Sequence, residues 1–114
     1  MTRYYIARID PYSAQPTPSV WACDADDLGR SIRVPSTTPE ARAFRVMANA
    51  TTTGLVSRDT FRQRCIATTR AEAIGLLAAS LAAEIATINE RLRDASANLL
   101  AVNALADERA TPGW

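Results

Sequence analysis

The chain has 114 residues, of which 47% are hydrophobic, and a formal net charge of +1 at pH 7; it has no His, and all 13 of its basic residues are Arg. The apolar fraction is sufficient for one packed domain, and the charge is too small to indicate a nucleic-acid partner by itself. Without His or Lys the chain cannot form Ser–His or Cys–His nucleophile pairs, His metal sites or Schiff bases, so we expect no enzyme and no cofactor.

The first predicted elements are strands. Residues 3–10 are rich in aromatic and β-branched side chains and end before a proline, which predicts a strand. Residues 11–18 contain three Pro residues and predict an irregular connection. Residues 20–23 and 32–34 predict a hairpin with its loop around 26–29, where Asp and Gly favour a turn.

A short helix and two more extended segments follow. Thr38 is a predicted N-cap and Pro39 occupies the first helical position, so we expect a helix over about 39–49. Residues 55–58 predict a short extended piece, and residues 61–67 predict a further strand.

One long helix is predicted over residues 69–107. Thr69 and Glu72 have the spacing of a capping box. Apolar residues then recur at heptad spacing through about five heptads. The candidate self-association residues on this stripe are Ile85, Ile88, Leu92, Leu99 and Val102.

The length of this helix leaves two arrangements open. A continuous helix over 69–107 would span about 58 Å, whereas a compact domain of this size is about 35 Å across. Either the helix pairs with a second copy as a coiled coil, forming a homodimer, or it breaks near 93–98 and folds back as a helical hairpin. The residues beside the stripe lack the opposite charges that usually flank a parallel zipper.

These elements predict the fold class and the domain organisation. We expect an α+β fold with a small antiparallel sheet of three or four strands, one short helix, and the long C-terminal helix or hairpin. Residues 1–110 are predicted to form a single domain, with the sheet and short helix in 1–67. Residues 111–114 are predicted to be a flexible tail.

The two cysteines indicate the compartment. Cys23 and Cys65 form no C-x-x-C pair, so we expect buried free thiols in a reducing cytoplasm rather than a disulfide or a zinc site. The N-terminus lacks the apolar core of a signal peptide, and the longest uncharged apolar run, 73–83, is too short to cross a bilayer. We therefore expect a cytoplasmic protein that does not bind a membrane.

Two acidic clusters could form a metal site or a catalytic acid–base pair, but neither has the pattern that such a site requires. The first, Asp24, Asp26 and Asp27, has oxygen ligands for Mg²⁺ or Ca²⁺, but it lacks the spacing of a calcium loop and is interpreted as a solvated turn. The second, Glu84, Glu90 and Asp94, is interpreted as surface charge paired with nearby Arg side chains rather than as an acid–base pair. We therefore predict no metal and no catalytic residue.

A candidate partner-binding surface is predicted on the sheet. Arg62 and Arg64 alternate along the predicted strand 61–67, so both guanidinium groups are expected on one side. Tyr4, Arg8 and Arg33 from the earlier strands are expected to join them. Arg and Tyr are common anchors of protein interfaces; the alternatives are nucleic-acid binding and solvated Arg side chains that protect sheet edges.

The length, the excess of Arg and Ala, and the order of short strands before a long Ala-rich helix resemble those of small phage and plasmid accessory proteins of the anti-CRISPR type. The resemblance implies a non-catalytic inhibitor that occludes a site on a host defence (CRISPR-Cas) effector complex. The near-neutral charge favours blocking a protein site over imitating DNA. The alternative functions are a nucleic-acid-binding accessory protein that uses the Arg-bearing sheet, and a structural phage protein that assembles through its long helix.

Overall fold

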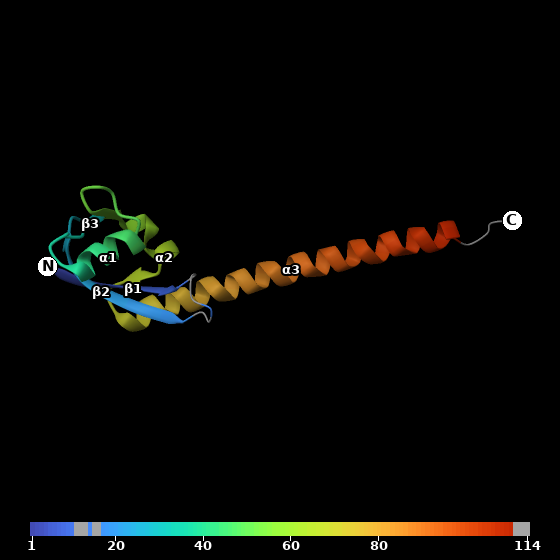
Figure 1. Ribbon diagram of the computed structural model, residues 1–114, viewed down its shortest axis with the longest axis horizontal. Coiled ribbons are helices and arrows are strands. Elements are labelled where there is room, and N and C mark those ends of the chain that lie inside the picture. The colour runs from blue at the N-terminus through green and yellow to red at the C-terminus, as the bar shows by residue number, and fades with distance from the viewer. Residues whose placement is uncertain (11–13, 15–16, 111–114) are drawn as a thin grey trace. The chain divides into compact units, whose positions relative to one another are not determined.

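The computed structural model describes residues 1–10, 14 and 17–110, with side chains up to residue 107 (Figure 1). The chain divides into two units, Met1–Ser80 and Leu81–Trp114, and each is described by itself. The predicted tail 111–114 and most of the predicted connection 11–18 lie outside the described residues.

The first unit is built on a five-stranded antiparallel sheet with the order β4-β3-β2-β1-β5. Its strands are β1 (Thr2–Ile9), β2 (Pro18–Asp27), β3 (Ser31–Arg33), β4 (Leu55–Ser57) and β5 (Ile66–Ala67). The α+β class and the antiparallel sheet are confirmed. The sheet has one strand more than the upper limit of the predicted range.

The helix α1 (Pro39–Met47) begins where the sequence predicts it. The Thr38 hydroxyl accepts a hydrogen bond from the backbone N–H of Ala41 at 3.1 Å, which confirms the N-cap. Helix α1 packs against the sheet through Phe44, which is fully buried with Tyr4 and Ile6 of β1.

The two faces of the sheet are covered by different elements. Successive residues of a strand point to opposite faces, so Tyr4 and Ile6 join the cluster beneath α1. Ala7 lies in a second cluster with Ala73 from the first turns of the helix α3 (Arg70–Ala110). Strand β1 is therefore buried on both faces, and it hydrogen-bonds to β2 on one side and β5 on the other.

The predicted strand over residues 61–67 is wrong in its first part. A 3₁₀ turn over Arg58–Thr60 leads into the short helix α2 (Phe61–Arg64). Helix α2 ends at Cys65, which has a left-handed backbone with φ of 59°, and only Ile66–Ala67 form β5. Arg and Gln are good helix formers, and four residues are too few for alternation to distinguish a strand from one helical turn.

The predicted hairpin of β2 and β3 is present with a tighter loop. Asp26 and Asp27 belong to β2, where they lie opposite Arg33 and Ile32. The turn is closed by Gly29, whose φ of +88° favours glycine and whose N–H donates to the Asp27 carboxylate at 2.8 Å.

Helix α3 is continuous over 41 residues, so the helical hairpin alternative is wrong. The Thr69 hydroxyl accepts from the Glu72 N–H at 3.1 Å, which is one of the two hydrogen bonds of the predicted capping box. Within the described chain, α3 is the one helix long and apolar enough to cross a membrane by length and composition, a criterion that core helices of soluble proteins also meet.

Candidate protein-binding surface

The second unit exposes the predicted self-association residues. Every side chain from Leu81 to Asp107 is exposed. The five residues of the stripe, which we call the seam, are exposed as follows: Ile85 59%, Ile88 53%, Leu92 63%, Leu99 61% and Val102 61%. A stripe of this kind is normally found against another surface, so the seam is unusual for a helix in water.

The end of the helix is apolar beyond the seam. No charged residue occurs between residues 95 and 106. Leu100, which lies outside the seam, is 70% exposed, and Leu105 is also exposed. A helix that is apolar on several sides is typical of one buried among other helices or in lipid.

A band of charge precedes this apolar end. The five charged residues of the band are Glu84, Glu90, Arg91, Arg93 and Asp94. They lie outside the heptad positions of the seam, so the apolar stripe continues through the band.

The beginning of α3 packs differently, within the first unit. Ala73 is buried, and Leu76 and Leu77 are half-buried against the cluster that contains Ala7. The first turns of α3 therefore pack on the sheet. Ile74, a stripe position in the same turns, is exposed.

The predicted Arg and Tyr surface is not assembled, and Tyr4 is the clearest correction. Its side chain is 0% exposed because the register of β1 directs it into the core beneath α1. A buried ring cannot serve as an interface anchor or as a platform for stacking bases.

The four arginines of that prediction lie on separate elements. Arg8 is on β1 and Arg33 is on β3, with β2 between these strands. Arg62 and Arg64 are on α2, so the strand face on which they were expected to align does not exist. Arg64 donates a hydrogen bond to the Ala48 carbonyl, which gives this guanidinium group a structural partner.

The structure instead brings together three side chains around Arg58, a cluster that sequence analysis did not identify. The Arg58 guanidinium group donates to the Tyr4 hydroxyl at 3.1 Å and contacts the Asp27 carboxylate at 2.8 Å. Its Cζ atom lies 5.5 Å from the centre of the Phe61 ring, and the Tyr4 and Phe61 rings meet edge to face at 5.7 Å. We call these residues the Arg58 cluster.

The Arg58 cluster has an electrostatic consequence. The hydrogen bond from Arg58, and then that from the Gly29 N–H, lower the pKa of the Asp27 carboxyl below its ordinary value. Asp27 and Tyr4 are 31 and 54 residues from Arg58 in the sequence, so no local pattern indicates the cluster. The Arg58 cluster connects β1, β2 and the turn before α2, so we interpret it as a stabilising contact of the first unit.

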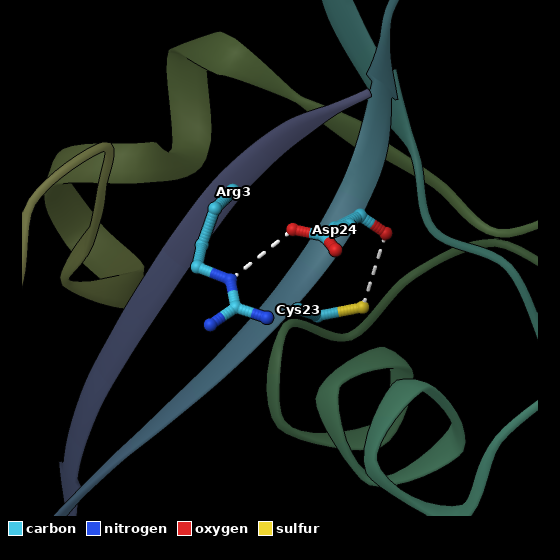
Figure 2. A network of polar contacts seen from close by, with 3 residues as sticks. All are labelled: Arg3, Cys23 and Asp24. Atoms are coloured by element: carbon cyan, nitrogen blue, oxygen red, sulfur yellow. Dashed lines mark hydrogen bonds and ion pairs between the residues drawn. The ribbon is translucent and has the colours of Figure 1, made fainter.

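Asp24 also has a structural partner. Figure 2 shows the Arg3 Nε donating to the Asp24 carboxylate at 3.1 Å and the Cys23 thiol donating to the Asp24 carbonyl at 3.3 Å. Arg3 and Asp24 are direct neighbours across β1 and β2. Within the described part of the chain, no group of three or more potential metal-ligating side chains comes together.

The two cysteines are free and buried, as predicted. Burial raises the pKa of the Cys23 thiol and that of the Cys65 thiol. Both are therefore protonated at neutral pH, and neither is an activated nucleophile.

An open cavity of about 630 Å³ lies in the first unit beside α2. Phe61, Ile66 and Leu76 supply apolar walls, and Arg62 and Glu72 supply charges at the rim. The lining also contains one hydroxyl, that of Thr68, beside the single carboxylate of Glu72.

No protein-family model matches this chain, and neither a curated protein nor a solved structure is similar to it.

Proposed function

We propose that the protein is a non-catalytic binding module whose contact surface is the apolar face of α3 over Leu81–Asp107. The observation that carries the proposal is the exposure of the seam along this segment. Soluble monomers rarely expose contiguous apolar patches of more than a few hundred Å², and larger ones mark interaction sites.

The stability of the helix supports the same proposal. Most helical stability in proteins comes from packing of an apolar face rather than from intrinsic propensity. Between Leu81 and Asp107 no described side chain is buried. A partner that covers the seam would provide the packing that this segment otherwise lacks.

The magnitude of the burial is adequate for binding. Burying one Leu, Ile or Val side chain completely contributes about 1.5–3 kcal/mol, and each seam residue is roughly half exposed, so each contributes about 1 kcal/mol. The five seam residues and a partner surface of the same size together contribute roughly 10 kcal/mol of favourable free energy on burial. This is comparable to the free-energy cost of association, which is about 4–15 kcal/mol. Side chains beyond the seam add to this.

The chemistry of the chain supports a non-catalytic role. The sequence has no His and no Lys, and both thiols are held in their protonated form by burial. The expectation that the partner is a host defence complex stays a prediction.

A binding experiment with matched variants tests the proposal. The full chain is immobilised and exposed to a bacterial lysate supplemented with untagged chain. Leu92→Asp places a charge in the seam, whereas Ala97→Asp places the same charge on the opposite face of the helix. We expect the wild type and Ala97→Asp to retain the same proteins, and Leu92→Asp to lose them.

Salt distinguishes this surface from a basic one. Retention through an apolar face should persist between about 50 and 200 mM salt, whereas nucleic-acid binding would collapse over that range. Equal retention by the wild type and Leu92→Asp would contradict the proposal.

A further inference from the structure

We propose that the occupant of the seam is the same chain: α3 assembles with further copies of itself into a parallel, in-register bundle of three or four helices. This inference rests on the proposed function and specifies its partner. Three features support it: the residue types at the seam positions, the apolar surface beside them and the placement of charge.

The spacing of the seam defines two kinds of heptad position. Ile85 is followed after three residues by Ile88, which is followed after four by Leu92. This alternation of three and four assigns Ile85, Leu92 and Leu99 to the first core position of a heptad. Leu81, Ile88, Ala95 and Val102 occupy the second, and each residue of both sets is apolar.

The residues at these positions favour more than two strands. In parallel coiled coils, Ile or Val at the first position with Leu at the second favours a dimer, and the reverse choice favours trimers and tetramers. From Ile88 to Val102 the preference is reversed: Leu92 and Leu99 hold the first position, and the β-branched Ile88 and Val102 hold the second, with Ala95 between them. The two-stranded choice occurs only at Leu81 and Ile85.

The apolar surface is also wider than a dimer covers. A strict two-position stripe is the narrow seam of a two-stranded coil, whereas helices in larger bundles also bury a flanking position. Leu105 occupies such a flanking position on one side of the seam, and Leu100 lies beyond the flanking position on the other side; both are exposed. Additional helices would cover side chains that a single partner leaves in water.

Charge placement favours identical, parallel neighbours. In that arrangement Glu84 lies beside Asn89 of the neighbouring copy, and Arg91 lies beside Ser96 of the neighbouring copy. Each contact joins a charge to a hydrogen-bonding side chain, and no like charges meet. Full antiparallel overlap would instead set Glu84 against the apolar Leu105.

A lipid bilayer is the less favourable occupant. The uncharged stretches 73–83 and 95–106 span about 17 and 18 Å, against a hydrocarbon core of about 30 Å. A helix that crossed with both stretches in lipid would carry the whole charged band between them, near the centre of the bilayer.

The mass of the full chain in solution tests the inference. Light scattering across a wide range of concentration should give three or four times the 12.3 kDa of one chain. Leu92→Asp should reduce the mass to one copy, and Ala97→Asp should leave it unchanged. Because Cys23 and Cys65 are buried, their lack of reaction with a thiol reagent verifies that the first unit of each variant remains folded.

A conservative exchange of seam residues tests the number of copies without adding charge. Exchanging the residue types at four positions restores the two-stranded preference: Ile88→Leu, Leu92→Ile, Leu99→Ile and Val102→Leu. We expect this variant to have the mass of two copies. A wild type that is a monomer or a dimer overturns the inference.

The orientation is tested by crosslinking. In a parallel, in-register bundle, Val102→Cys places the new thiols in one layer, so mild oxidation should join two chains through this residue. In full antiparallel overlap Val102 lies opposite Ile85, about 25 Å along the helix from the other Val102. Failure to crosslink in an assembled sample overturns the parallel arrangement.

Two further outcomes separate this inference from the proposed function. A monomeric wild type whose retention of another protein is lost in Leu92→Asp overturns only the self-assembly. A monomeric wild type that floats with neutral phosphatidylcholine vesicles, and whose retention of proteins is the same as that of Leu92→Asp, overturns both and assigns the helix to lipid.

Discussion

The first unit and the segment Leu81–Asp107 use similar apolar residues in opposite ways. In the first unit, side chains such as Phe44 and Ile32 are completely removed from water between the sheet and α1. Along Leu81–Asp107, Leu and Ile side chains are more than one-third exposed. The sheet and α1 therefore form a finished core, whereas the helix carries apolar side chains that the single chain leaves exposed.

The largest expected effect comes from a core substitution in the first unit. Phe44→Ala removes a fully buried ring and should lower the free energy of unfolding by about 3–5 kcal/mol. Urea unfolding followed by thiol exposure reports on this unit, because both cysteines lie within it. In the same assay Leu99→Ala should change the free energy of unfolding of the first unit by less than about 0.5 kcal/mol. A comparable loss of stability in both variants would contradict the distinction between the two regions.

A backbone substitution gives the next largest effect. Gly54 has φ of +84°, and a Cβ atom there would lie 2.3 Å from the Val34 carbonyl oxygen, where the Arg45 Nε already donates at 2.7 Å. Gly54→Ala should therefore cost about 2–3 kcal/mol, measured by thermal unfolding. Gly29→Ala is the matched control, since it has a similar φ with no atom within 4 Å, and should cost about 1 kcal/mol.

Loss of Arg58 should have a smaller effect. Arg58→Ala removes the hydrogen bond to Tyr4 and the contact with the Phe61 ring, so we expect a destabilisation of about 1–2 kcal/mol. Tyr4→Phe removes the hydroxyl alone and should cost less, about 1 kcal/mol. An unchanged melting temperature in Arg58→Ala would show that the cluster does not contribute to the stability of the sheet.

The smallest expected effect is the pH dependence of the stability that Asp27 contributes through the Arg58 cluster. The pKa of Asp27 is lower in the folded state than its ordinary value of 3.8. Its contribution to stability is therefore present above that value and is lost as the pH falls through the folded pKa. Urea midpoints measured from pH 5 downward should fall less steeply for Asp27→Asn than for the wild type; identical slopes would contradict the assignment.

Local signals in the sequence predict much of this fold. The caps at Thr38 and Thr69, and the strand pattern of residues 3–10, depend on neighbours within a few positions, and the structure confirms them. The division of residues 61–67 was not predicted, because a single helical turn and a short strand have the same pattern at this length.

The candidate surfaces show the limit of local signals more clearly. The burial of Tyr4 depends on the register of β1, which is covered on both faces, so alternation could not show which Tyr is internal. The Arg58 cluster joins residues far apart in sequence. The apolar stripe of α3, in contrast, is a property of one helix, and its positions were predicted directly.

The pairing of β5 with β1 has a consequence for synthesis of the chain. The fifth strand ends at residue 67, and the first turns of α3 that cover the other face of the sheet end before Leu81, so the whole first unit precedes the exposed apolar segment in the order of synthesis. Because segments nearer the N-terminus fold first during synthesis, the first unit can fold ahead of that segment, and the two sets of apolar side chains need not compete for each other.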